Sequence, residues 1–599
     1  MSDDLLVYFN RELNRLRAAR QEFADGQRTI AERLSFSSDT VEDPHISRLI
    51  DAFAFLTARI QRKLDDEFPE LTDSLLGVLY PHLLAPVPSM SILQIEPERD
   101  LAGCYHIDAN RTVELSGASV EVCRFRTGYP LDLWPVRIDH AVLARRPSPA
   151  PQNRYAPNAV AILKLTLATT NGRTFSDLQL DRLRFHLPGE PALARALYEQ
   201  IFAGTVSIAV ANGPNDDNPV FLDRSHLREV GFEREEGLLP FGAGSALSYR
   251  LLTEYFSFPD KFLFFDVTGL AAKTLGQAGK TMEVYFYLNR VNDVLEPTVT
   301  VSSFALGCTP LINLFSQRAE PIKLTQHLDE YRVVADLRRQ QTTEIYSIDR
   351  VTGSASGGRT ASFSPFYWPE HDRQNSERRY WHPVRRYLGG DRRSEIFISL
   401  VDLAFDPGQE AGWTLSVEAT CFNGDLPRQL PFGNGSPAVT LVDSGAGILS
   451  QKLLTRPTRV LRPPLGQGAR WRFISHLTAN HLSLAAGADA LREMLRLYDV
   501  QNSAETRHII DGILDVSAQP AIARLAGAPA GICRGLDFTL ELADFLSASG
   551  DGHLLASMVE RFLGLYVTLN SFTRLTAQFN GAADPFRRWP ARSGSRILA

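Results

Sequence analysis

Residues 43–90 read DPHISRLIDAFAFLTARIQRKLDDEFPELTDSLLGVLYPHLLAPVPSM and contain a helical pattern with a defined start and end. Asp43 is suited to cap the first turn, and Pro44 fits the next position because an N–H there would have no partner within the helix. Pro69 ends the pattern because proline disfavours the α conformation at Phe68. The stretch therefore predicts a helix roughly 36–39 Å long, from the usual rise per residue.

One face of this helix is apolar. Its large residues recur at helical spacing: Ile46, Leu49, Phe53, Leu56, Ile60 and Leu64. Ile50, Ala54 and Ala58 form a second, flatter row, which we expect beside the first. A stripe of this width suits a helix that contacts two neighbours rather than one. A shorter helix is predicted near residues 72–80, ending at Pro81.

A second seam runs through the preceding segment, LLVYFNRELNRLRAARQEFA. Its apolar residues also follow helical spacing: Leu6, Phe9, Leu13, Leu16 and Phe23. Both seams are candidate interfaces with other proteins. A stripe of this kind is more often part of a domain's own core, and the spacing alone does not decide between a core and a joint.

Length and composition limit the classes of protein that fit. A chain of 599 residues predicts several domains, and 63 Lys and Arg against 69 Asp and Glu give a net charge of -6, which disfavours a nucleic-acid-binding role for the whole chain. Five cysteines without a CxxC pair predict neither a zinc site nor a disulfide framework, and fit a reduced cytosolic compartment. We expect no secretion signal and no membrane-spanning segment.

After Ser89 the apolar residues alternate with period two, which predicts short strands to about residue 450. Helices are predicted at residues 192–202, 488–498 and 554–569. The fold class predicted is a multidomain α+β protein with an N-terminal helical segment, β-rich middle domains and a mixed α/β C-terminal domain. The limits predicted for these parts are residues 1–90, 91–350, 351–450 and 451–599.

The motifs that resemble catalytic or cofactor sites fail on their context. GQAGKTMEVYFYLN (276–289) ends a loop with Gly279-Lys280-Thr281, but a phosphate loop needs glycine where Thr274 stands and a helix where a strand is predicted. GSASG (353–357) has Ala355 at the position of the nucleophilic serine and lies in a stretch predicted as a loop, TGSASGGRTASFSP. His476 and His481 are wrongly spaced for two metal ligands on one helix. We predict no catalytic, cofactor-binding or metal-binding residue.

The stretch RRYWHPVRRYLGGDRR (378–393) is strongly basic and aromatic. It is compatible with a partner surface on which arginines stack against Tyr380 or Trp381. It is also compatible with a solvated loop whose arginines pair with acidic neighbours, which we favour because the whole chain is acidic.

Several separated segments resemble one family in the same order, from Tyr8 to Leu575. They are YFNRELNRLRAARQEFA, the 43–90 stretch, CRFRTGYPLDLWPVRI, VGFEREEGLLPFGAGSALSYRLLTEYFSFPDKFLFFD, CTPLINLF, AEPIKL, WRFISHLTANHLSL with ALREMLRLY, and CRG followed by VERFLGLYVTLNSFTRL. Together they resemble the TssF family, also called VasA or ImpG, of type VI secretion system baseplates. The basic stretch and the glycine-rich loop lie outside these segments.

This resemblance implies a structural protein of a contractile injection system and not an enzyme. Two copies would join one TssG to form a wedge, and the wedge would bind TssK and TssE around a hub that carries the spike. The baseplate would then start assembly of the tail tube and sheath in the cytoplasm, docked at the inner membrane. No cofactor, nucleic acid or membrane insertion is implied, and the two N-terminal seams are the candidates for the wedge contacts.

Two alternatives stay open from the sequence. The chain is also compatible with a wedge protein of a phage tail or tailocin baseplate, which neighbouring genes would distinguish. A β-rich carbohydrate-binding or hydrolytic protein belongs to a different class. In that case aromatic side chains would stack on sugars, and the candidates are Trp134, Tyr367, Trp368 and Trp381.

Overall fold

A computed structural model gives the fold of the chain. The described residues are 9, 12–13, 44–65, 75–77, 81–117, 120–240, 247–276, 278–325, 328–355, 360–366, 379–387, 393–402, 413–433, 435–442, 445, 447–463, 473, 487–524, 532–564, 567, 571–582, 584–593 and 596–597. Within them the chain is a β-rich α+β protein with several sheets, which confirms the predicted fold class at this level.

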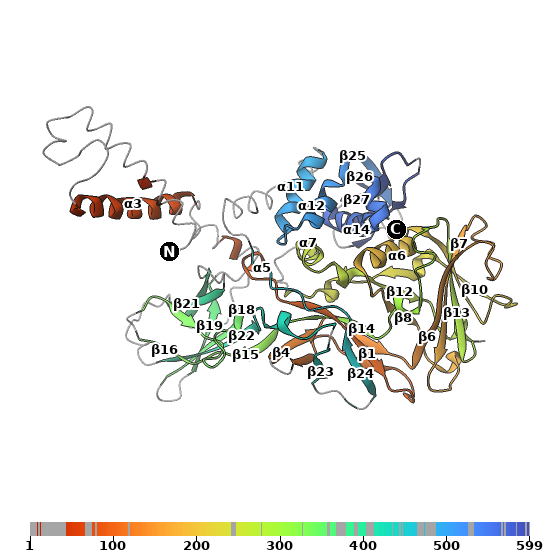
Figure 1. Cartoon of the computed structure of the whole chain (residues 1–599), viewed down its shortest axis with the longest axis horizontal. Helices are drawn as coiled ribbons and strands as arrows, with labels where there is room; N and C mark the ends of the chain where they lie inside the picture. Colours follow the sequence, from red (N-terminus) through yellow and green to blue (C-terminus); the bar gives the residue numbers. More distant parts are fainter. Residues whose placement is uncertain are drawn as a thin grey trace.

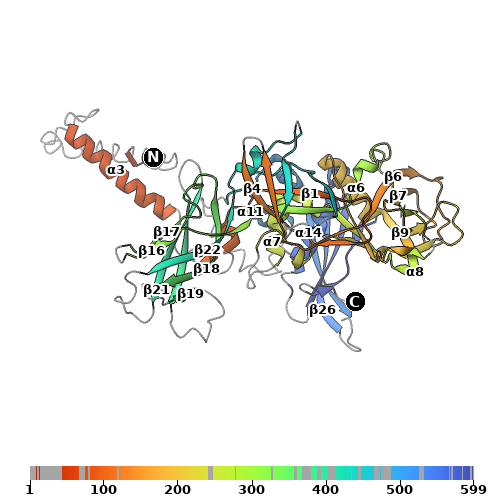
Figure 2. The same cartoon turned by 90° about the horizontal axis from the view of Figure 1, so that it is seen from below.

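The helix α3 (Pro44–Asp65) projects from one end of the molecule, apart from the sheets, in both views (Figure 1 and Figure 2). It covers most of the rod predicted from the capping residues. Helix α5 (Pro81–Leu84) begins at Pro81. Proline fits this first position of a helix. Residues 75–77 are helical, and the end of the helix predicted near residues 72–80 lies outside the described residues.

A central antiparallel sheet has the strand order β23-β3-β4-β14-β1-β24. The bounds are β1 Met90–Pro97, β3 Thr112–Gly117, β4 Val120–Thr127, β14 Cys308–Ile312, β23 Ala438–Leu441 and β24 Ile448–Leu453. The edge strands approach each other where the Leu441 N–H donates to Gln451 Oε1 at 3.1 Å. A separate pair is formed by β2 (Tyr105–Ile107) and β5 (Leu131–Leu133).

Two further sheets lie beside the central one. The five-stranded sheet has the order β10-β9-β13-β7-β6, and the three-stranded sheet the order β11-β12-β8. Their bounds are β6 Val136–Arg145, β7 Ala161–Thr169, β8 Arg182–His186, β9 Thr205–Ala211, β10 Val220–Asp223, β11 Leu227–Glu229, β12 Phe264–Thr268 and β13 Thr281–Leu288. Thr281 begins a strand, as predicted, so the Gly279-Lys280-Thr281 sequence does not lead into a phosphate-binding helix.

The fourth sheet has the order β15-β22-β18-β19-β20-β21-β17, with β16 paired to β22. Its bounds are β15 Phe315–Arg318, β16 Ile322–Lys323, β17 Tyr331–Val333, β18 Glu344–Ser354, β19 Thr360–Pro365, β20 Arg379–Tyr387, β21 Ser394–Asp402 and β22 Thr414–Phe422. The prediction of a loop for the glycine-rich stretch is wrong in its described part, because residues Val351 to Ser354 of β18 pair antiparallel with β19.

The C-terminal sheet has the order β25-β26-β27-β29-β30, with β28 paired to β27. Its bounds are β25 Ile513–Arg524, β26 Ile532–Leu542, β27 Ser571–Phe579, β28 Arg587–Arg588, β29 Arg592–Ser593 and β30 Arg596–Ile597. Strands β26 and β27 are parallel and are connected through α13 (Asp544–Ser549) and α14 (Asp551–Leu563). This crossover makes the C-terminal part a mixed α/β unit, as predicted.

Four further helices gather where the middle and C-terminal parts meet: α6 Pro191–Gly204, α7 Leu247–Ser257, α11 Ala488–Tyr498 and α12 Ala504–Asp511. Helix α8 (Ala272–Leu275) packs against the 3-10 helix Phe175–Asp177, and other short 3-10 helices are Arg224–His226, Arg234–Glu236, Pro259–Phe262, Val301–Ser303 and Leu426–Gln429. The largest apolar core runs through α6, α7, α11 and α14, so both parts share one hydrophobic interior. The predicted domain limits at residues 350 and 450 fall inside β18 and β24.

Candidate protein interaction surface

The apolar face predicted for the long helix is exposed on α3. Leu49, Phe53, Leu56 and Ile60 are 58%, 57%, 53% and 62% exposed, respectively, and we call these four residues the α3 stripe. They follow one another by four, three and four positions, so they lie along one side of the helix. Large apolar side chains that are more than half exposed in a continuous row are typical of an interaction site.

The flatter row lies elsewhere than the sequence suggested. Ala54 and Ala58 are fully buried, and about 100° of helical turn per residue places them roughly opposite the α3 stripe. The expectation that they flank the stripe is therefore wrong. Because α3 buries its small residues and exposes its large ones, burial within the chain does not account for the large ones.

The other predicted interface residues are described only in part. Phe9 and Leu13 are helical and half-buried. Ile46 and Leu64 lie in α3, where the description extends to the backbone only. The side chains of Leu6, Leu16 and Phe23 lie outside the described residues, so the first seam stays a prediction.

In its described part, Arg379–Tyr387, the basic stretch is the strand β20 and not a loop, and it pairs with β21. Arg385 donates through Nη1 to the Ile345 carbonyl at 3.1 Å and to Ser394 Oγ at 2.8 Å. Arg386 pairs with Glu330 at 2.6 Å, as the favoured interpretation predicted. The arginines of the described part therefore find partners inside the chain.

The predicted stacking partners of these arginines are also different. Trp381 is buried, and the Tyr380 ring contacts Phe366 edge-on. Arg379 instead lies over the Trp413 ring, and Arg386 over the Phe397 ring. These contacts hold neighbouring strands together and leave Trp381 inaccessible to a sugar.

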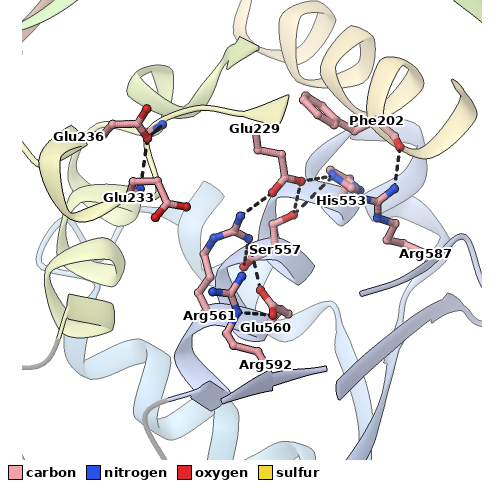
Figure 3. Close-up of polar contacts among 11 residues, drawn as sticks. Phe202, Glu229, Glu233, Glu236, His553, Ser557, Glu560, Arg561, Arg587 and Arg592 are labelled. Atoms are coloured by element: carbon pink, nitrogen blue, oxygen red, sulfur yellow. Dashed lines mark hydrogen bonds and ion pairs between the residues drawn. The ribbon is translucent and has the colours of Figure 1, made fainter. Parts of the chain in front are cut away.

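A cluster of charged side chains lies at the junction between β11 and α14 (Figure 3). Glu229 Oε1 is 2.8 Å from His553 Nε2 and accepts a hydrogen bond from Ser557 Oγ at 3.0 Å, while Glu229 Oε2 accepts one from Arg561 Nη2 at 2.8 Å. We call these four residues the Glu229 cluster. Nearby, Arg592 of β29 donates to Glu560 Oε1 at 2.6 Å. The cluster thus links β11 to α14, and the Arg592–Glu560 pair links α14 to β29.

The protonation states in this cluster follow from burial and charge. Burial acts to raise the pKa of Glu229, but Arg561 and His553 overcome it and hold that pKa below its usual value. Burial lowers the pKa of His553 to about 4, although the hydrogen bond to Glu229 acts in the opposite direction. At neutral pH the cluster therefore contains an ionised carboxylate, a guanidinium and a neutral imidazole.

These residues do not have the geometry of a hydrolase triad. In a triad, the serine and the acid contact different nitrogens of the imidazole. Here His553 Nε2 faces both Glu229, at 2.8 Å, and Ser557, at 3.5 Å, and Nδ1 has no hydrogen-bond partner within the described residues. His553 and Ser557 are also fully buried. The arrangement fixes α14 against β11.

A cavity of about 580 Å³ lies between β1 and β6. Trp134, from the sugar-binding alternative, is half-buried and lines it together with Asp132 and Arg184. Asp132 is bound to His106 and Arg182, and Arg184 makes two hydrogen bonds to Asp266. The carboxylate of Asp132 and the guanidinium of Arg184 are thus held by partners within the chain. Tyr367 and Trp368 lie outside the described residues.

The described part of the chain contains no group of three or more His, Cys, Asp and Glu side chains placed to hold a metal ion. Nor does any of its helices combine the length and the hydrophobicity needed to cross a bilayer. Sequence patterns missed the Glu229 cluster, since the spacing of His553, Ser557 and Arg561 on one helix does not reveal that their partner is Glu229, which is 324 residues from His553.

Comparisons with known proteins identify a family over the whole chain. The family model described as type VI secretion system, TssF matches residues 1–596. The chain is 35% identical to the type VI secretion system component TssF1 of Pseudomonas aeruginosa over 621 aligned positions, which cover 100% of both proteins.

Solved structures agree with this assignment. A chain of the cryo-electron microscopy structure of the type VI secretion system TssK-TssF-TssG baseplate subcomplex has a TM-score of 0.73 and 28% identity, covering 92% of this chain and 100% of its own length. A chain of the baseplate complex from the type VI secretion system has a TM-score of 0.61 at 23% identity, covering 99% and 100%. The second likeness concerns the fold alone.

Proposed function

The chain belongs to the TssF family of type VI secretion system baseplate components, and we propose that it is a structural wedge subunit that joins its partners through the α3 stripe. In this proposal the joint lies within residues 1–90, and the rest of the chain, predicted as residues 91–350, 351–450 and 451–599, forms the body. The chain acts by holding other subunits in place and catalyses no reaction.

The proposed assembly follows the wedge expected for this family. Two copies join one TssG, and the wedge binds TssK and TssE around the spike-bearing hub. Support for TssK and TssG comes from the solved relative, which belongs to a TssK-TssF-TssG subcomplex. The finished baseplate starts the tail tube and sheath in the cytoplasm, docked at the inner membrane.

The observation that carries the proposal is the exposure of the α3 stripe. Fully burying an exposed large apolar side chain contributes about 1.5–3 kcal/mol, and the four residues are a little over half exposed, so completing their burial contributes roughly 3–7 kcal/mol. Association of two proteins costs about 4–15 kcal/mol. The stripe alone therefore supports only a marginal joint, and a bundle to which several chains contribute helices is favoured over a single pair.

The test places charge in the middle of the stripe. The double variant Leu49→Asp with Phe53→Asp is co-expressed with TssG, and complex formation is measured by co-purification and mass measurement. We expect at least a 100-fold loss of affinity. Two apolar contacts are lost, and two charged carboxylates would have to be desolvated at the interface. Circular dichroism and thermal unfolding of the isolated variant should match those of the wild type.

A matched control places two aspartates on the same helix outside the stripe. Arg48 and Arg59 are exposed on α3, and Arg48→Asp with Arg59→Asp changes the charge even more strongly. This control should still form the complex. A normal complex with the stripe variant, or equal loss with the control, would exclude the stripe as the joint.

A further inference from the structure

The outer end of the β25–β26 hairpin carries an apolar and basic face. The two strands pair antiparallel, with Ile522 opposite Arg534 and Arg524 opposite Ile532. Residues opposite each other in such a pair project to the same side of the sheet. The four side chains therefore form a square with isoleucines on one diagonal and arginines on the other, which we call the arm face.

The arm face is unoccupied within the described part of the chain. Ile522 and Ile532 are 67% and 71% exposed, the two highest values among the large apolar residues described. Toward the base of the hairpin the same side turns inward, where Phe538 and Leu540 enter the main core and Leu536 is half-buried. Figure 2 shows β26 extending away from the helices that cover this base.

The opposite side of the hairpin is occupied. Cys533 is buried there with Phe572 and Ala591, and Ala521 and Ala523 pack against them. The hairpin is therefore held in place by one side, while the other side keeps its isoleucines in solvent. Such an asymmetric strand end is unusual unless the second side has a partner.

Charge determines which kind of partner fits. Arg524 and Arg534 are exposed and form no ion pair with a described residue. Asp537 projects from the other side and binds Arg574 at 2.9 Å. Two unpaired guanidinium groups beside two isoleucines complement a surface on which apolar side chains are bordered by carboxylates.

Two other occupants fit less well. A second copy meeting arm to arm would bring four arginines together, and the α3 stripe of a second copy is bordered by the exposed Arg48 and Arg59. An added strand on the free edge of β25 would meet Pro520, which has no N–H to donate. The features therefore favour a face-on contact with a different protein.

We infer that the arm face is a docking site for an acidic, apolar surface of a different subunit. This goes beyond the wedge joint, because α3 takes no part in it and the charge requirement is distinct. The isoleucines supply the buried area, and Arg524 and Arg534 determine which partner is accepted.

The test is photo-crosslinking in cells that make the full chain with its secretion partners. A benzophenone amino acid replaces Ile522, and in a control chain it replaces Val142, an exposed residue of β6. We expect the Ile522 probe to crosslink to one other protein, at a peptide containing Asp or Glu. Arg524→Glu with Arg534→Glu should reduce this crosslink at least tenfold and leave the Val142 pattern and the melting temperature unchanged.

Each other outcome overturns the inference. These outcomes are no intermolecular crosslink, crosslinks only to a second copy, the same partner at Val142, and a crosslink that survives the charge reversal. Recovery of TssG with the same chain is measured in parallel and reports the wedge joint separately. A chain that retains TssG without an Ile522 crosslink would disprove the arm contact and leave the proposed function intact.

Discussion

The α3 stripe and the Glu229 cluster are two contrasting kinds of contact surface, one apolar and exposed, the other charged and buried. The stripe consists of four large apolar side chains that stay in solvent. The cluster consists of charged and polar side chains that are buried and bonded to one another. A buried charged joint tolerates only one alignment of its elements. An exposed apolar surface stabilises an assembly when another chain buries it. The comparison predicts different consequences when each is damaged.

The largest effect is expected from Arg561→Met in the Glu229 cluster. The change leaves Glu229 ionised in a buried site without its guanidinium partner, and it removes the contact of Arg561 with the Phe232 ring. Breaking one side of a buried ion pair costs about 3–5 kcal/mol. The free energy of unfolding, measured by urea denaturation, should fall by about that amount.

Arg59→Met is the matched control on α3. Arg59 is exposed, so its loss should change the free energy of unfolding by less than about 0.5 kcal/mol. Equal effects of the two substitutions would mean that the Glu229 cluster contributes no more than a surface arginine does, and the contrast between the two regions would disappear.

The next effect concerns pH. Burial lowers the pKa of His553 from 6.5 to about 4, so the folded chain binds this proton less tightly than the unfolded chain does. Above pH 6.5 His553 is neutral in both states, and its protonation does not lower the free energy of unfolding. As the pH falls from 6.5 toward 4, the unfolded chain binds the proton first, so the free energy of unfolding decreases by about 1.4 kcal/mol per pH unit and by up to about 3 kcal/mol in total. His553→Gln should remove this part of the pH dependence.

The measurement is the difference between wild type and His553→Gln in urea unfolding at pH 7.5, 5.5 and 4.5. A difference is needed because burial raises the pKa of Glu199 to about 7, which lowers stability as the pH rises through the same range. If the two proteins lose stability in parallel on acidification, His553 is not neutral in the folded chain.

Local patterns in the sequence predicted the elements that depend on near neighbours. The helix predicted at residues 488–498 is α11, and the one at 192–202 is α6 within two residues at each end. The strand after Thr281 was also predicted, because alternation of apolar residues is a local property. These segments need no knowledge of distant contacts.

The elements that sequence patterns missed depend on distant contacts. Gly353 and its polar neighbours predicted a loop, but Gly353 lies in β18 against the Trp413 ring, where an added Cβ would come within 2.7 Å of that ring. Glu229 and His553 are 324 residues apart, and neither carries a motif. For the α3 stripe, the spacing was predictable, whereas its exposure depends on what the rest of the chain covers.

The smallest effect, and the sharpest test of the contrast, is expected from Ile60→Ala. Ile60 is mostly exposed, and alanine favours helix more than isoleucine does, so the free energy of unfolding should change by less than about 0.5 kcal/mol. Affinity for TssG should fall roughly tenfold, because about 1–2 kcal/mol of apolar burial is lost at the joint.

Leu555→Ala in α14 is the matched control: Leu555 is buried, so that change should lower the free energy of unfolding by about 2–5 kcal/mol. Calorimetric titration with TssG and urea unfolding measure the two quantities separately. If Ile60→Ala destabilised the isolated chain as much as Leu555→Ala does, the stripe would belong to the core of this chain rather than to a joint with another.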